Sequence, residues 1–136
     1  MHMTWKLVAA VLVAGTLGSL TDWLFMGVLF HDRYNKYPEV WWPGVRGGKD
    51  NTGIIWSSVL GYLATAAIVT LCAIAGVHTI ATGLILAALA WTAGPLLVLV
   101  VNGFFIKFDP LLTASHSAGY LVRFLLAGLA AGIALG

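Results

Sequence analysis

Charged residues are scarce in this chain. Asp, Glu, Lys and Arg make up 9% of its 136 residues, whereas soluble domains carry about 25%. Because 60% of the residues are hydrophobic and the mean hydropathy is +0.95, polar side chains cannot cover a water-facing surface. The composition predicts one domain that uses lipid as its solvent and leaves no room for a soluble module.

Catalytic and redox signatures are also lacking. Cys72 is the one cysteine, so no intrachain disulfide can form, and its apolar surroundings indicate a packing role. The chain has no CxxCH, HExxH or paired-Cys motif, and no recognisable nucleophile–base pair or phosphate-binding loop. We therefore expect no enzymatic activity and predict no cofactor.

Four apolar segments exceed the roughly 20 helical residues needed to cross about 30 Å of hydrocarbon. They must be helical, because lipid offers the backbone no hydrogen-bond partners. The expected spans cover about residues 5–30, 53–76, 78–105 and 113–135. They predict one all-α domain over residues 1–136, an integral membrane bundle of four transmembrane helices with both termini on the same side. Gly94-Pro95 predicts a kink in the third span.

The distribution of Lys and Arg predicts the orientation. Basic residues gather in the segments 31–52 and 106–112, namely Arg33, Lys36, Arg46, Lys49 and Lys107, while the opposite side has only Lys6. We expect both segments to be cytoplasmic and both termini to lie outside, in a multi-pass protein of the cell (inner) membrane.

Asp22 and Arg123 lie near the middle of apolar stretches that carry no other full charge. A charge at mid-bilayer costs at least about 2.5 kcal/mol and normally faces a partner or a polar cavity. Asp22 lies ten residues before Asp32, and Arg123 lies ten after Thr113. At 1.5 Å per residue, both lie about 15 Å from the same face. We predict a buried Asp22–Arg123 pair.

Three roles for these two charges stay open: a pair that only fixes helix register, a ligand or proton site, or two groups that do not touch. Other polar residues are expected to join them in a cluster that opens toward the cytoplasm: Asn102, His116, Tyr120, Ser57 and Ser58. His31 and His116 are weak candidates for a haem or metal site. Their simpler interpretation is interfacial histidines hydrogen-bonded to backbone or water.

Small residues in the spans predict close helix packing. Ala14 and Gly18 precede Asp22 at four-residue spacing in the first span, and Gly61 lies in the second. The fourth span ends in a GxxxGxxxG pattern formed by Gly128, Gly132 and Gly136. That groove is expected to pack either within the chain or against another copy.

The polar, aromatic segment 31–52 is expected to lie at the level of the lipid headgroups. Its interface anchors would be Tyr34, Tyr37, Trp41 and Trp42. A lid or a partner-docking segment is the alternative.

Several pieces of the chain resemble a small bacterial four-span family catalogued as domain of unknown function 1761. They are the end of the first span, Gly18 to Phe30, then Asn102 to Phe105, Asp109 to Leu112 and His116 to Val122. The similarity covers nearly the whole chain, although Trp41-Trp42 and Arg123 have no counterpart in it. It implies a four-helix membrane fold and brings no activity or site residues.

These observations predict a non-catalytic multi-pass membrane protein, an accessory or structural subunit that packs in an oligomer or a larger membrane complex, without nucleic acid. One alternative is a small proton-coupled or small-molecule transporter that uses Asp22. Its layout is similar in outline to the small multidrug resistance family, although the acid there is Glu and a tight Arg123 pair would disfavour transport. A haem- or metal-binding subunit using His31 and His116 is the second alternative.

Overall fold

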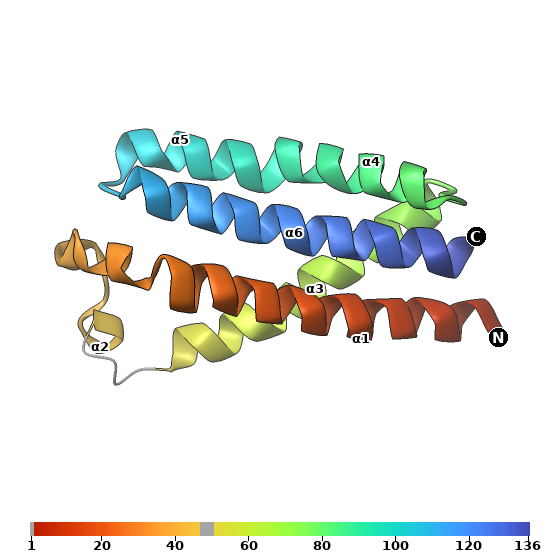
Figure 1. The fold of residues 1–136 in the computed structure, drawn as a ribbon, viewed down its shortest axis with the longest axis horizontal. Coiled ribbons are helices and arrows are strands. Elements are labelled where there is room, and N and C mark those ends of the chain that lie inside the picture. Colours follow the sequence, from red (N-terminus) through yellow and green to blue (C-terminus); the bar gives the residue numbers. More distant parts are fainter. Residues whose placement is uncertain (1, 47–50) are drawn as a thin grey trace.

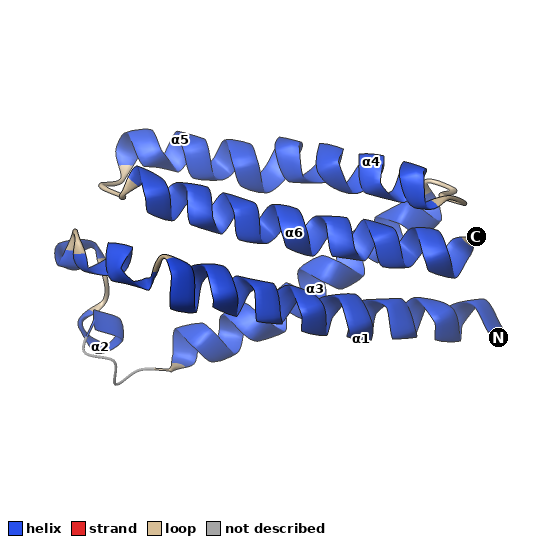
Figure 2. Ribbon diagram, viewed as in Figure 1, coloured by secondary structure: helices blue, strands red, loops and turns tan. Residues whose placement is uncertain are grey.

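The computed structural model describes residues 2–46 and 51–136. Within these residues the regular elements are helical and no strand occurs (Figure 2). Four helical stretches are long and apolar enough to cross a membrane: Thr4–Leu29, Thr52–Ile74, Ile80–Phe105 and Pro110–Leu135. The predicted all-α bundle of four spans is confirmed, and the chain is a membrane protein. Lys49, used above to predict orientation, lies outside the described residues.

The first and third spans both change helix type along their length. The first is α1 (His2–Asp22) followed by a π-helical segment (Trp23–Leu29), and the third is α4 (Ile80–Trp91), a π-helical turn (Thr92–Leu96) and α5 (Leu97–Phe105). Pro95 lies in that turn, where the kink was expected. The second span is α3 (Thr52–Ile74) and the fourth is α6 (Pro110–Leu135). The segment after the first span forms 3-10 turns (His31–Asn35 and Pro38–Val40) and the short helix α2 (Pro43–Arg46).

Local sequence explains two helix boundaries. After α3, Gly76 adopts a φ of 69°, and the Val77 N–H donates to the Cys72 carbonyl, which closes the helix and turns the chain into α4. Before α6, the Asp109 carboxylate accepts the Leu111 N–H at 2.8 Å, and Pro110 takes the first helical position. This cap starts the fourth span three residues before the predicted residue 113.

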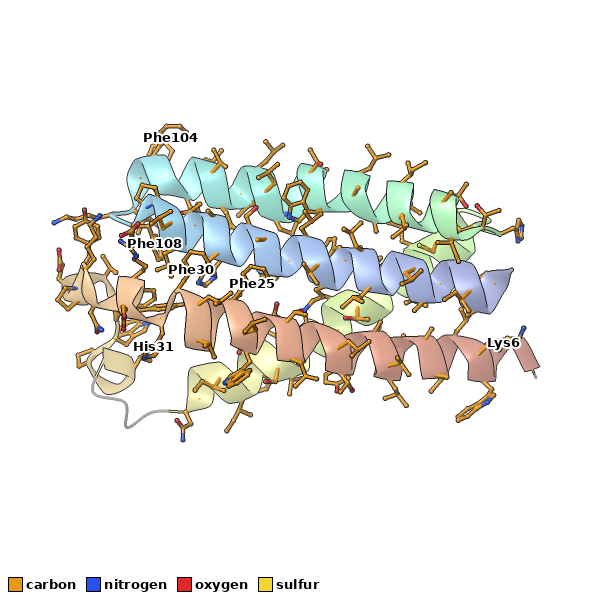
Figure 3. The ribbon with its side chains drawn as sticks, viewed as in Figure 1. Lys6, Phe25, Phe30, His31, Phe104 and Phe108 are labelled. Atoms are coloured by element: carbon orange, nitrogen blue, oxygen red, sulfur yellow. The ribbon has the colours of Figure 1, made fainter. Side chains whose placement is uncertain are left out.

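Helix α6 is the centre of the bundle. It lies between α1 on one side and α4 with α5 on the other, while α3 crosses obliquely behind α1 and α6 (Figure 1). Both termini and the α3–α4 turn lie at one end, called here the termini end, and the segments 30–46 and 106–109 lie at the loop end. Figure 3 labels Lys6 at the termini end and His31 at the loop end.

Glycines bring α4 against α6. A Cβ atom on Gly83 would collide with the Gly128 carbonyl oxygen, and one on Gly128 would collide with that of Gly83. A Cβ on Gly132 would lie 2.7 Å from the Ile80 Cα, and one on Gly136 would lie 3.0 Å from the His78 carbonyl oxygen. The GxxxGxxxG groove therefore packs within the chain, and Gly83 is the partner that sequence reasoning missed.

The apolar core occupies the termini half of the bundle. Its buried members come from α3, α4, α6 and the α3–α4 turn: Ile68, Val69, Cys72, Val77, Ala87, Phe124, Ala127 and Ala131. The α3 members follow Thr65 and the α6 members follow Arg123, so the core begins directly beyond the predicted ion pair. Cys72 is fully buried, as expected of a packing residue.

Replacing either glycine at the α4–α6 contact should separate these helices. We expect Gly83→Leu and Gly128→Leu each to lower the free energy of unfolding by about 1–3 kcal/mol, because added methylenes overfill a close contact. Reversible unfolding in detergent micelles measures this loss. Gly103→Leu is the matched control, since a Cβ at Gly103 meets nothing within 4 Å. Equal losses at all three positions would show that the close approach of α4 to α6 is unimportant.

Candidate functional site

Arg123 forms the centre of a polar site among three spans. Its Nε and Nη2 atoms both donate to Oδ2 of Asp22, at 3.1 and 2.5 Å. Nη1 donates to the Thr65 hydroxyl at 3.3 Å, and Nη2 also donates to the Ser19 hydroxyl at 3.4 Å. The acceptors lie on α1 and α3, whereas the donor lies on α6, so one guanidinium ties three helices together.

The site is closed and electrically neutral. The Arg123 side chain is 1% exposed and that of Asp22 is 24% exposed. Thr65 is fully buried, and its hydroxyl donates to the Gly61 carbonyl at 3.0 Å, which leaves an oxygen lone pair for Arg123. Because the cation is paired and hydrogen-bonded, the large penalty for an isolated charge in lipid is offset.

Glycines on the same three helices make room for the pair. A Cβ on Gly61 would lie 2.6–2.8 Å from the guanidinium, and one on Gly18 would lie 3.2 Å from it. A Cβ on Gly119 would lie 3.1 Å from Oδ1 of Asp22. The sequence predicted Gly18 and Gly61 as helix-packing positions, and the structure adds that what they admit is the Arg123 side chain.

The second oxygen of Asp22, Oδ1, is buried and has no hydrogen-bond donor among the described residues. It lies 3.1 Å from the position that a Cβ atom of residue 119 would occupy. Gly119 therefore supplies the space for this oxygen.

The change of helix type coincides with this site. The α-helical part of the first span ends at Asp22, and the π-helical segment begins at Trp23. Within this segment the Phe25 carbonyl accepts the Phe30 N–H at 3.1 Å and the Ser115 hydroxyl at 3.3 Å. The altered winding gives α6 one further hydrogen bond to the first span, and π turns recur at functional positions of helices.

His116 connects the fourth span to the loop end. Its Nε2 shares a hydrogen bond of 2.7 Å with the Tyr34 hydroxyl. Burial raises the pKa of Tyr34 to about 12, so the phenol keeps its proton and can donate to this nitrogen. Tyr120, one turn further along α6, packs instead against the apolar core.

Besides Tyr120, three residues of the predicted polar cluster do not join it. Ser57 and Ser58 are exposed, and both hydroxyls donate to the Ile54 carbonyl of their own helix at 2.9 Å. Asn102 is exposed on α5. The reason for the two serines is helix direction, because the loop-end half of α3 diverges from the bundle (Figure 1).

The structure also does not bring His31 and His116 together in the metal or haem site considered for them. His31 is exposed, whereas His116 is engaged by Tyr34, whose ring lies between them at centroid distances of 6.2 and 5.9 Å. Among the described residues, no group of three or more His, Cys, Asp or Glu side chains is placed to hold a metal ion.

Two of the four predicted interface anchors turn inward. Tyr34 lies 5.1 Å from Trp41 between ring centroids, and the Trp41 indole N–H donates to the Tyr34 carbonyl at 2.8 Å. Trp41 also meets Phe108 edge to face at 5.5 Å, and Tyr37 lies under the Lys36 and Lys107 ammonium groups. Only Trp42, 82% exposed, projects as a membrane anchor should. The aromatics instead fold the loop over the end of α6.

Asp109 holds this loop in place. Its carboxylate caps α6 and also lies 3.1 Å from the Lys36 ammonium and 3.8 Å from the Arg33 guanidinium. The Leu111 N–H lowers the pKa of this carboxyl, as do the two nearby cations, although burial acts in the opposite direction. The Asp109-Pro110 dipeptide was the signal available in the sequence, because Asp before Pro is a common helix start.

A second unnoticed signal marks the ion-pair site itself. Each of its three helices carries a glycine four residues before a polar residue: Gly18 before Asp22, Gly61 before Thr65, and Gly119 before Arg123. Four residues make about one helical turn, so the space left by each glycine and the polar side chain after it lie on the same face of the helix. Thr65 and Gly119 could have been found from this spacing.

Breaking the pair should destabilise the bundle. We expect Asp22→Ala and Arg123→Ala each to cost about 3 kcal/mol, because each leaves a charge unpaired inside the membrane. The double variant should lose about 2 kcal/mol less than the sum of the two single losses. Reversible unfolding in micelles measures the cycle, and losses that add to within about 0.5 kcal/mol would contradict direct coupling.

The exposed ion pair between Lys107 and Glu39 is the matched control for this cycle. Its Nζ–Oε1 distance is 3.1 Å, but the two side chains are 64% and 56% exposed. Water and salt screen such pairs, so the coupling from Lys107→Ala and Glu39→Ala should stay below about 1 kcal/mol.

Acid should loosen the start of α6. Because the folded pKa of Asp109 is lowered, its stabilising effect is complete above the ordinary carboxyl value of about 3.9 and is lost as the pH falls through the lower folded value. We expect hydrogen-exchange protection of the Leu111 amide, corrected for intrinsic rates, to drop over that interval. Asp109→Asn should abolish this pH step, and an unchanged step in the variant would assign it to another group.

No family model, curated protein or solved structure matches the chain. The resemblance to domain of unknown function 1761 therefore stays a prediction, and so does the outline similarity to the small multidrug resistance family. The site is a neutral, largely buried ion pair that joins α1, α3 and α6.

Proposed function

We propose that this chain is a non-catalytic structural subunit of a membrane assembly, in which a transmembrane helix of another subunit or of a second copy covers its α4–α5 span. The observation that carries this proposal is how little of that span is enclosed. In its most apolar window, 6% of the Ile80–Phe105 stretch is buried inside the chain, compared with 39% for Pro110–Leu135.

Asn102 supports a protein partner at this face. Its amide is exposed on α5 and makes no hydrogen bond to a described residue. An amide without a partner in apolar surroundings is unfavourable, and Asn side chains commonly hydrogen-bond across membrane helices. Val98, Val101 and Phe105 are exposed at spacings of three and four residues around it. Phe104, also exposed, projects from the same end of α5 in Figure 3.

The ion pair supports a structural role over transport. Arg123 neutralises Asp22, and every hydrogen bond of the guanidinium ends on a neighbouring helix. Two hollows on the described surface lie at the loop end, and neither is lined by Asp22 or Arg123. Transport through Asp22 is the second candidate, favoured by its buried oxygen without a donor. It would require the pair to open during each cycle.

We also propose that the loop end faces the cytoplasm, in the cell (inner) membrane. Arg33, Lys36 and Lys107 lie at this end, and only Lys6 lies at the other among the side chains that the structure describes. Positive residues are retained on the cytoplasmic side of membrane proteins.

Cysteine crosslinking in native membranes tests the assembly. With Cys72→Ser as background, single cysteines at Val98, Asn102 and Phe105 are labelled with a benzophenone maleimide. On illumination the ketone inserts into a nearby C–H bond, so each label should form a covalent adduct to one neighbouring protein without needing a thiol on the partner. Ile55→Cys and Leu63→Cys are the controls, because both positions are exposed on α3, away from α5. Dimer-sized adducts would identify a second copy, and larger ones another subunit.

Adducts at the α5 and α3 positions in equal yield would indicate random collision. That result, or no adduct at any α5 position, would contradict a partner on this face. If no adducts form, and if membrane vesicles containing the protein take up protons but vesicles containing Asp22→Asn do not, the transport alternative would be favoured instead.

A further inference from the structure

A polar hollow lies where the first span ends. It has a volume of about 480 Å³ and is lined by Leu29, Phe30, Asp32, Arg33, Asn35 and Lys36. Leu29 is the last residue of the membrane-spanning stretch, so the hollow lies at the depth of the lipid headgroups. Figure 3 labels Phe30 at this end of the first span.

Two cations line the hollow with donors to spare. Arg33 and Lys36 are about half exposed, and both face the buried Asp109 carboxylate from the loop side. The Arg33 guanidinium approaches that carboxylate through Nη1, at 3.8 Å, and makes no hydrogen bond to a described residue. The guanidinium therefore keeps donors available, in the planar arrangement that suits a phosphate group.

An acid lies beside these cations. Asp32 is exposed, lines the same hollow and forms no ion pair or hydrogen bond with a described residue. With Asp109 behind Arg33 and Lys36, two positive and two negative charges meet around the hollow. A balanced set does not favour an anion. It matches a ligand that carries both signs, with a phosphate toward Arg33 and an ammonium toward Asp32.

We propose that this hollow binds a phosphate ester that carries a primary ammonium group, in the form of a phosphatidylethanolamine headgroup. The lipid form is favoured over a free ester because Leu29 and Phe30 extend the lining toward the acyl chains. This proposal is independent of what covers the α4–α5 span, so either can fail alone.

Native mass spectrometry of the full chain in detergent tests the site. Phosphatidylethanolamine, phosphatidylcholine and phosphatidylglycerol with identical acyl chains should compete for one retained lipid. We expect phosphatidylethanolamine to be retained about tenfold over phosphatidylcholine, whose trimethylated nitrogen cannot donate to Asp32, and over phosphatidylglycerol, whose headgroup has no cation. Equal retention of the three lipids would overturn the proposal.

Asp32→Asn is the decisive variant, since this exposed side chain forms no ion pair or hydrogen bond with a described residue and its replacement should leave the fold intact. It should abolish the preference for phosphatidylethanolamine over phosphatidylcholine. Glu39→Gln is the matched control, because this loop acid pairs with Lys107 and does not line the hollow. An unchanged preference in Asp32→Asn, or the same loss in both variants, would contradict the assignment.

Soluble glycerophosphoethanolamine separates the two sources of the headgroup. At equal concentration it should leave the bound lipid in place, because it lacks the acyl chains that meet Leu29 and Phe30. Full displacement of the lipid would assign the hollow to free phosphate esters and overturn the lipid form.

Discussion

The charge of Arg123, near the midpoint of α6, constrains the rest of the bundle. A guanidinium at that depth must be paired, and Asp22 with Thr65 and Ser19 supplies the acceptors from two other helices. Each contact fixes an axial position and a rotation, so α1 and α3 cannot slide along α6 without breaking hydrogen bonds. The oblique crossing of α3 is compatible with this constraint, since α3 needs to approach α6 closely only around Gly61 and Thr65.

The two halves of the bundle then differ in what stabilises them. Beyond the ion pair, toward the termini end, apolar side chains and the Gly83–Gly128 contact join α3, α4 and α6. Toward the loop end, α3 diverges, and the aromatic loop with Asp109 covers the start of α6. The α4–α5 span contributes no group to the ion pair, and 6% of its most apolar window is buried inside the chain. A pair fixed in this way favours a structural role, because a substrate site at Asp22 would first have to break it.

The sequence predicted the depth of residues along the helices correctly, but it did not predict the rotation of each helix about its own axis. Hydropathy located four spans, and counting residues from a common face placed Asp22 and Arg123 at one level, because rise per residue is constant in a helix. The sequence did not reveal which face of each helix points into the bundle, since the rotation of a helix about its axis depends on the crossing angles between helices. Asn102 was therefore assigned to a buried cluster, whereas its side chain is exposed. Trp41 was taken for a membrane anchor because a loop gives no periodicity from which to read its inward packing.

Solid-state NMR in lipid bilayers can measure whether the Asp22 and Arg123 side chains are in contact. With Arg and Asp labelled, the dipolar coupling between the side-chain nitrogens of Arg123 and the Asp22 carboxyl carbon reports their distance without perturbing the pair. We expect a strong coupling for both Nε and Nη2, since both atoms donate to the same carboxylate oxygen. An Asp22 carboxyl carbon without measurable coupling to Arg123 would contradict the ion pair, because the two charges would then not meet in the membrane.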